Sequence, residues 1–506
     1  MDSQYSGKSG KTYPLKQSTL INKFQKDFFP KYLRENIYVI ALTIFIIAVR
    51  IISGFNGLYG QDAYEYLRYT NLLDKFFYHG SNPGHFFWPA GYPLSGSLLN
   101  LIIHNTSLSL QLISVLSFII STVYIKNFLE KFLKEIKTEV KYFVLLFFCF
   151  SPYIFRSAFL VMPESLSILC ITGFIYHLFL YTGNNKTKDF ALAVFFMMFS
   201  VITRYANFVI DFIPSIYLFI FFLKKFDFKK FFAGIVIILL MILPHIIISG
   251  GGSMDFLSHE WLREWSVSNF FSSKFHTANG LEVYKQFNLI YPFESLVHPA
   301  FIFSGILFLF FLRRKDFKSF FYKVLAVSLL IYFVFLAGIP YQDLRFLIPS
   351  FPLVILVLFA GYERVTRKFL KQKYRKFLFV IFIVLQIVFI YKYSIGIYTI
   401  NKFEKETAGI IKNYDSSRML YTFYLSGALK YYGVKNHLID LYDVKLSNVT
   451  SGSYILFNAD KFKKQWADEL PMINWNYLKS NYELKAVYKF GNNFMESGWI
   501  LYEISK

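Results

Sequence analysis

The chain has 506 residues, of which 55% are hydrophobic, 21% aromatic and only 17% charged. A soluble protein of this length would carry about 25% charged residues, so the composition excludes an ordinary soluble enzyme. A net charge of +22 suggests a nucleic-acid partner in a soluble protein, but here the basic residues lie in loops between apolar runs. Such loops set membrane topology and contact anionic lipid, so we predict no nucleic-acid partner.

The first residues, 1–36, are polar and basic, and we predict that they form a cytoplasmic tail. The apolar run that follows, at about 37–53, lies too far from the start for a cleaved signal peptide, so we expect a retained membrane anchor. Apolar runs of roughly 15–22 residues then recur to about residue 395. They predict a polytopic α-helical membrane protein with about eleven transmembrane helices over 37–395.

The loops between these runs differ in charge. If the chain crosses the membrane at every run, the strongly basic loops fall on one side together with the N-terminus. The positive-inside rule places that side in the cytoplasm and places two long loops, at about 54–107 and 249–297, outside. We therefore predict a multi-pass protein of the plasma or inner membrane, with a cytoplasmic N-terminus.

The first outer loop contains two helical patterns and a pair of acids. Aromatic residues recur at helical spacing from Ala63 to Tyr78, which predicts a helix on the membrane interface, and Tyr92–Ile103 predicts a second. Asp62 and Glu65 stand at the start of the first helix. One interpretation is a capping box, in which both carboxylates satisfy backbone N–H groups. The other, compatible with it, is that Asp62 is a positioned and partly desolvated general base.

The end of the chain, about 396–506, has a different character. Strand patterns occur at about 418–424, 454–457, 484–490 and 499–504, with helical patterns at about 426–432 and 460–479. This alternation predicts a small soluble α/β domain outside the membrane. No motif in it indicates a particular chemistry.

Metal and cofactor signals are absent from the sequence. Cys149 and Cys170 both fall in apolar runs, so they predict neither a disulfide framework nor a metal site. No cluster of His, Asp and Glu has metal-ligand spacing, and no glycine-rich loop would hold a nucleotide phosphate. We therefore predict no metal, no cofactor and no nucleotide donor.

Several short motifs occur in an informative order over about 37–365. They are Asp62 after the first run, Tyr92-Pro93, Ser151-Pro152 followed by Met162-Pro163-Glu164, Thr203-Arg204-Tyr205, and Arg345–Pro349. In this order they resemble the GT-C superfamily of membrane glycosyltransferases, and most of all the branch of the protein O-mannosyltransferases and lipid A aminoarabinose transferases. Many members of that branch have two adjacent acids where this chain has Asp62-Ala63.

The resemblance implies an activity. A sugar, hexosyl or pentosyl, would pass from a polyprenyl-phosphate donor to an extracytoplasmic hydroxyl acceptor on a glycolipid, polysaccharide or protein, with inversion. Asp62 would be the general base. Arg204 and Arg345, at predicted span ends on the outer side, would bind the donor phosphate. The alternative for these arginines is interfacial snorkelling or a structural pair, such as Arg345 with Asp343.

Other residues are candidates for substrate contacts. His85 and Trp88 could line a sugar site or belong to an aromatic belt at the interface. Glu164 could be a second active-site carboxylate, or a helix N-terminal acid that favours the macrodipole. The full set of candidates is Glu65, Tyr66, His85, Trp88, Tyr92, Glu164 and Tyr341.

Two other functions fit a chain with many spans. A surface-polysaccharide polymerase or ligase would rely on loop arginines rather than on an acid in the first loop. A transporter or flippase of lipid-linked sugars would show internal repeats and broken helices at the bilayer midplane. No half-to-half repeat is visible in the sequence.

Overall fold

The computed structural model describes residues 37, 39–84, 86–132, 138–248, 260–302, 305–369, 372–491 and 498–505. The predicted tail at 1–36, His85 and residues 249–259 of the second outer loop lie outside the described residues. The chain divides into two compact units, 1–53 and 54–506. In the first unit the structure describes one apolar helix, Val39–Ser53.

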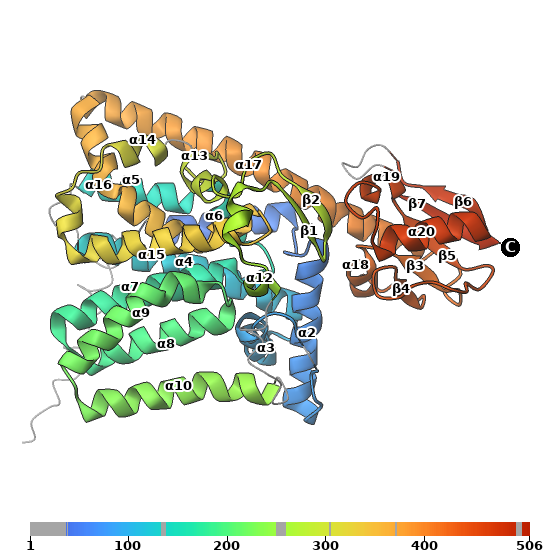
Figure 1. Cartoon of the computed structure of the whole chain (residues 1–506), viewed down its shortest axis with the longest axis horizontal. Helices are drawn as coiled ribbons and strands as arrows, with labels where there is room; N and C mark the ends of the chain where they lie inside the picture. Colours follow the sequence, from blue (N-terminus) through green and yellow to red (C-terminus); the bar gives the residue numbers. More distant parts are fainter. Residues whose placement is uncertain are drawn as a thin grey trace, which may run out of the picture. The chain divides into compact units, whose positions relative to one another are not determined.

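The second unit begins with a helical region, shown in Figure 1. Its longer helices are α2 (Gly60–His79), α3 (Gly91–Ile103), α4 (Thr106–Phe132), α5 (Thr138–Cys149), α7 (Glu164–Asn184), α8 (Thr187–Thr203), α9 (Asn207–Lys224), α10 (Phe228–Ile248), α15 (Phe320–Gly338), α16 (Phe351–Phe369) and α17 (Gln372–Ile411). Shorter helices are α6 (Pro152–Ser157), α12 (Glu260–Arg263), α13 (Glu294–Val297) and α14 (Gly305–Phe310), with 3-10 turns η1 (Val267–Phe271), η2 (Tyr291–Phe293), η3 (Asp316–Lys318) and η4 (Leu344–Leu347).

Six of the described helices are long and apolar enough to cross a membrane: α4, α7, α9, α10, α15 and the part of α17 from Val380 to Ile411. The most apolar segment of α7 is 83% buried by its neighbours, whereas that of α10 is only 11% buried. An exposed helix that is apolar all round is stable only in lipid, which confirms a multi-pass membrane protein. The count of about eleven spans stays a prediction.

A proline divides one of the predicted spans. The apolar run expected to span at 142–153 is instead two helices, α5 and α6, which are separated at Ser151-Pro152. Pro152 opens α6, and Ser151 before it is extended, with φ −61° and ψ 122°. This follows from the proline ring, which lacks an N–H and disfavours helical backbone in the preceding residue.

Both helices expected in the first outer loop are present, as α2 and α3, but the capping box at the start of α2 is wrong. The residue that caps α2 is Tyr59, whose side chain makes no capping hydrogen bond. The acceptor comes instead from α17, where Glu404 Oε1 accepts from the Gly60 N–H at 3.0 Å and Oε2 accepts from the Tyr64 hydroxyl at 2.7 Å. Glu404 thus ties α2 to the far end of the chain.

A close contact fixes α3 against the end of α8. A Cβ atom on Gly91, the first residue of α3, would lie 2.5 Å from the carbonyl oxygen of Ile202 in the last turn of α8. Only glycine permits this approach, because any side chain would collide with backbone. The contact places the loop before α3, with Trp88, beside the segment that carries Arg204.

The C-terminal region contains the expected small α/β domain. Its five-stranded sheet has the order β4-β3-β5-β7-β6, in which β3 is parallel to β4 and β5, and β7 is antiparallel to β5 and β6. The core includes Ile455, Leu456 and Trp499, and also Phe403 and Ile411 from the end of α17. The elements are β3 (Leu420–Thr422), β4 (Leu438–Asp440), β5 (Tyr454–Phe457), β6 (Glu483–Lys489), β7 (Ile500–Ser505), α18 (Ser426–Tyr431), α19 (Ala459–Phe462) and α20 (Leu470–Asn481).

Two further features differ from the sequence prediction. The single helix expected at 460–479 is divided into α19 and α20, with Pro471 in the first turn of α20. The segment predicted to be the second outer loop contains an unpredicted hairpin of β1 (Lys274–Thr277) and β2 (Gly280–Val283), paired antiparallel. Both strands have only four residues, which is too short for a clear alternating pattern.

Candidate active site

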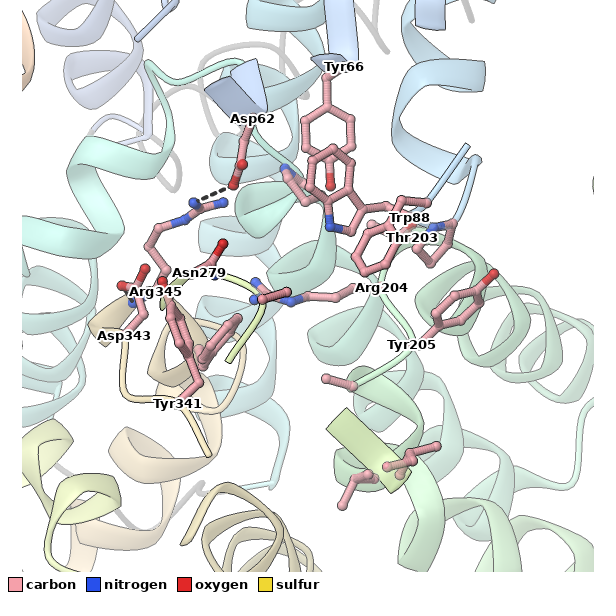
Figure 2. A pocket seen from close by; sticks show the side chains of 18 of the residues that line it. Asp62, Tyr66, Trp88, Thr203, Arg204, Tyr205, Asn279, Tyr341, Asp343 and Arg345 are labelled. Atoms are coloured by element: carbon pink, nitrogen blue, oxygen red, sulfur yellow. Dashed lines mark hydrogen bonds and ion pairs between the residues drawn. The ribbon is translucent and has the colours of Figure 1, made fainter. Parts of the chain in front are cut away.

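One cavity of about 490 Å³ brings together residues that are far apart in the sequence (Figure 2). Asp62 enters it from the first turn of α2, Arg204 from the position directly after α8, and Arg345 from η4. The cavity therefore lies where α8 and α15 end and where α9 begins, at one end of the membrane helices. The opposite ends of α4 and α9 carry Lys131 and Lys224.

Arg345 is the centre of the polar contacts in this cavity. Its Nη1 atom donates to Asp62 Oδ2 at 2.8 Å, and its Nε atom donates to Glu164 Oε1 at 2.9 Å. The Arg345 side chain is 18% exposed, that of Glu164 is 2% exposed, and that of Asp62 is 38% exposed. Arg345 therefore bridges a buried carboxylate and a carboxylate that solvent can reach.

Glu164 also holds the second arginine. Arg204 Nη1 lies 3.4 Å from Glu164 Oε1, and the Arg204 guanidinium lies over the ring of Phe346 at 4.7 Å from its centroid. Arginine prefers such combinations of a carboxylate and an aromatic face. Because Glu164 is the first residue of α7, the helix dipole also favours its negative charge.

Two guanidinium groups face the carboxylates of Asp62 and Glu164 in this cluster, and Asp343 lines the same cavity. Burial alone would lower the pKa of Arg345, but the nearby Glu164 and Asp62 carboxylates raise that pKa well above its ordinary value. Arg345 therefore keeps its positive charge at every physiological pH. An anion that entered the cavity would compete with Asp62, the more exposed of the two carboxylates, for this guanidinium.

Asp343 does not form the side-chain pair with Arg345 that was considered from the sequence. Its carboxylate instead accepts from the backbone N–H of Arg345 at 2.8 Å and caps the short helix η4. The Tyr291 hydroxyl donates to the backbone carbonyl of Asp343. These contacts fix the backbone from which the Arg345 side chain extends, and they leave its guanidinium to Asp62 and Glu164.

Aromatic side chains form part of the cavity wall. Tyr66 and Trp88 stack with their ring centroids 5.1 Å apart, and both line the cavity (Figure 2). Tyr341 lines it as well, close to Phe346, with 5.6 Å between the ring centroids. Flat apolar faces beside charged groups suit a sugar ring, which presents apolar C–H faces and polar hydroxyl edges.

Other predicted contact residues lie elsewhere. Tyr92 is fully buried, and its hydroxyl donates to the Leu110 carbonyl at 3.0 Å, so it supports α3 rather than lining the cavity. Glu65 pairs with Arg68 on the exposed side of α2. Glu164 is buried behind the two arginines, and His85 lies outside the described residues.

Further cavity residues were not among the site candidates chosen from the sequence. Asn279 comes from the tip of the β1–β2 hairpin and Tyr442 from the C-terminal domain. The dipeptide Asn279-Gly280 is a hairpin-turn signal that could have located the first of these. No sequence signal indicates Tyr442. Thr203, Tyr205, Asp343 and Phe346 also line the cavity and flank the two arginines in the chain.

The acidic, histidine and cysteine side chains are the groups that could bind a metal ion. Within the described ranges, no group of three or more His, Cys, Asp and Glu side chains is arranged to hold a metal ion. The two acids of the cluster are already paired with arginine.

Comparisons with known proteins place this geometry in a fold class. Residues 89–248 match the family model described as dolichyl-phosphate-mannose-protein mannosyltransferase. The crystal structure of ArnT from Cupriavidus metallidurans in the apo state matches with a TM-score of 0.54 and 12% identity, over 91% of this chain and 97% of that chain. The structure of the same protein bound to undecaprenyl phosphate gives a TM-score of 0.58 and 12% identity, over 92% and 98%. The chain has the GT-C fold.

The resemblance predicted from the motifs is therefore confirmed at the level of fold. No curated protein matches the chain. The family match and the shared fold together support the class of membrane glycosyltransferases. The family match begins at Pro89 and includes Glu164 and Arg204. Asp62 and Arg345 lie outside the matched residues.

Proposed function

We propose that the protein is an integral membrane glycosyltransferase that moves a sugar from a polyprenyl-phosphate donor to an extracytoplasmic hydroxyl acceptor. The observation that supports this most is the cluster of Asp62, Arg204, Arg345 and Glu164 beside an aromatic cavity at one end of the membrane helices. Positive charge, a reachable carboxylate and aromatic faces are the three features that such a transfer needs.

The two arginines would bind the donor phosphate. When the sugar leaves, the phosphate gains negative charge, and fixed guanidinium groups stabilise that charge without reorganising. A phosphate is a good leaving group, so no general acid is required. Glu164 would act as a positioning residue, because it holds both guanidinium groups from the buried side. The ArnT structure with undecaprenyl phosphate supports a lipid of this chemistry as the partner of the fold.

Asp62 would be the general base. In the structure its carboxylate is paired with Arg345 at 2.8 Å, so it is already held by a guanidinium group. A bound donor phosphate would compete for the same guanidinium and release Asp62 toward the acceptor hydroxyl. The base would thus become available only when the donor is in place. Direct attack from the side opposite the phosphate would invert the anomeric carbon.

The cavity would face away from the cytoplasm. The ends of α4 and α9 opposite the cavity carry Lys131 and Lys224, and the positive-inside rule places such ends in the cytoplasm. The C-terminal domain, which contributes Tyr442 to the cavity, would then also lie outside the cytoplasm. This orientation agrees with a lipid-linked donor that is used on the outer face.

A transfer assay tests the proposal. Purified protein in lipid would receive a panel of radiolabelled polyprenyl-phosphate sugars and an extract of cell-envelope lipids, polysaccharides and proteins as acceptor. We expect the wild type to transfer label, and we expect Asp62→Asn to reduce the rate about 100-fold or more, since general bases contribute roughly that much. If the wild type transfers no sugar from any donor, the proposed function is wrong.

Glu65→Gln is the matched control for this assay. Glu65 lies one turn from Asp62 on α2, but its carboxylate pairs with Arg68 outside the cavity. We expect this variant to transfer sugar at the wild-type rate. Equal losses in both variants would mean that negative charge on α2 matters in general and that Asp62 is not the base.

A further inference from the structure

The tip of the β1–β2 hairpin contacts both the cavity and the C-terminal domain. Thr277 pairs with Gly280, so Ala278 and Asn279 form a two-residue turn, and both line the cavity. The hairpin belongs to the second outer loop and is too short to hold its own position in water. Its placement therefore depends on the contacts that it makes with other parts of the chain.

Gln465 supplies most of these contacts. Its backbone carbonyl accepts from the Leu281 N–H at 2.7 Å, and its Nε2 atom donates to the Asn279 carbonyl and to Glu282 Oε1, both at 2.8 Å. Gly280 has φ +81°, and a Cβ atom there would lie 2.2 Å from the Gln465 carbonyl oxygen. The hairpin thus packs its glycine closely against the C-terminal domain and is bonded to it at the turn and along the start of β2.

Tyr442 completes the connection. Its hydroxyl donates to the Ala278 carbonyl at 3.2 Å, and its ring packs at the edge of Trp466, with 5.8 Å between the centroids. Trp466 is buried in the domain core and directly follows Gln465. Tyr442 also lines the cavity itself. A rigid domain therefore positions both its own tyrosine and the hairpin turn at one wall.

We propose that this wall, formed by Asn279 and Tyr442 and held by Gln465, binds the acceptor. The proposal rests on the proposed function. Asn279 and Tyr442 offer neutral amide and phenol groups, which suit the hydroxyls of a sugar or similar polar acceptor. A donor phosphate would instead select the guanidinium groups of Arg204 and Arg345. Gln465 is a positioning residue in this scheme, since it acts through the hairpin.

The role of the wall can be separated from that of the donor site by kinetics. In the transfer assay, the envelope extract would be varied at saturating labelled donor, and the donor would then be varied at saturating extract. For Gln465→Ala we expect the half-saturating amount of extract to rise about tenfold, as the loss of one or two positioning hydrogen bonds implies. The half-saturating donor concentration should stay within about twofold of the wild-type value.

Lys463→Ala is the matched control, because Lys463 lies two residues away and pairs with Asp460 on the exposed surface. It should leave both values unchanged. Tyr442→Phe is a second test variant that keeps the ring and removes the bond to Ala278, so it stays informative if Gln465→Ala folds poorly. We expect it to raise the half-saturating amount of extract as well.

The outcomes are distinct. If the wild type transfers sugar and the extract dependence of Gln465→Ala and Tyr442→Phe is unchanged, the wall does not bind the acceptor. The proposed function then stays intact. If the half-saturating donor concentration rises instead, the wall binds the donor, and the proposal that it binds the acceptor is wrong as well. A wild type with no transfer would remove the proposed function and this inference together.

Discussion

Glu164 has a side chain that is only 2% exposed, yet its Oε1 atom lies within 3.4 Å of nitrogen atoms on both Arg204 and Arg345. A buried carboxylate with two cationic partners is costly to remove, because its loss leaves both guanidinium groups without their common counter-charge. At the scale of single residues, the stability of the cluster and the positions of both arginines depend on this one side chain.

We expect Glu164→Gln to lower the free energy of unfolding by about 3 kcal/mol, the usual cost of breaking a buried pair from one side. Thermal unfolding in a fixed lipid or detergent would measure it. Asp460→Asn is the control, since Asp460 pairs with Lys463 and both side chains are mostly exposed. Equal stability of Glu164→Gln and the wild type would show that the cluster contributes nothing to the fold.

Arg345→Lys tests the geometry of the guanidinium rather than its charge. Lysine keeps the positive charge but cannot contact Asp62, Glu164 and a phosphate through separate nitrogen atoms. We expect the affinity for polyprenyl phosphate to fall about tenfold or more, as measured by equilibrium binding of the labelled lipid. Arg68→Lys, on the exposed side of α2, should bind like the wild type. If Arg345→Lys also binds like the wild type, charge alone is sufficient.

The sequence could predict some of these residues and not others. Arg204 and Arg345 could be chosen because an arginine at the outer end of an apolar span is expensive unless it has a partner. Glu164 could be named as a candidate acid, but its role as their shared partner could not be predicted, since Glu164 and Arg345 are 181 residues apart and only the packed fold brings them together. The capping box failed for a related reason, because Asp62 bonds to distant Arg345 instead of its own helix.

Helix α17 connects the membrane region with the C-terminal domain at the scale of elements. It continues for 40 residues without a break, and its last turns enter the core of the domain through Phe403 and Ile411. On the way Glu404 accepts hydrogen bonds from Gly60 and Tyr64 at the start of α2. Asp62 lies in the same first turn of α2 as Gly60, so its position depends on α17.

We expect Glu404→Ala to destabilise the protein by about 1–3 kcal/mol, because it leaves the buried Gly60 N–H and the Tyr64 hydroxyl without an acceptor. Since α2 carries Asp62, the transfer rate should fall as well. Unfolding and transfer would be measured on the same preparation. Glu406→Ala is the control, because Glu406 is 40% exposed and faces Lys402 on the surface. An unchanged transfer rate in Glu404→Ala would mean that α2 holds Asp62 without this tie.

Element prediction from the sequence succeeded where the local signal was long. The aromatic repeat after Asp62 gave α2, and the alternation near the C-terminus gave most strands of the sheet. It failed at β4 and at the β1–β2 hairpin. These short strands are stabilised by partners from distant segments, such as Gln465 for β2.

At the scale of the whole molecule, the proposed function requires a cavity and a C-terminal domain that face away from the cytoplasm. Both native cysteines, Cys149 and Cys170, are buried, so introduced cysteines report with low background. Lys225, after α9, and Lys479, on α20, are exposed sites at which to place them.

In right-side-out vesicles we expect a membrane-impermeant maleimide to label Lys479→Cys and not Lys225→Cys, because the basic end of α9 should be cytoplasmic. Inverted vesicles should give the reverse pattern, and the wild type should remain unlabelled in both. Labelling of both sites from the same side, or of Lys225→Cys from outside, would rule out the proposed orientation.

In the proposed mechanism Asp62 acts in the reaction, whereas Arg204 and Arg345 bind the donor phosphate. The most direct measurement determines polyprenyl-phosphate binding and sugar transfer on one preparation of Asp62→Asn. We predict binding at least as tight as in the wild type, because a carboxylate that competes for Arg345 is gone, together with transfer that is about 100-fold slower or more. Transfer at the wild-type rate, or a loss of lipid binding that accounts for the slower transfer, would contradict the claim.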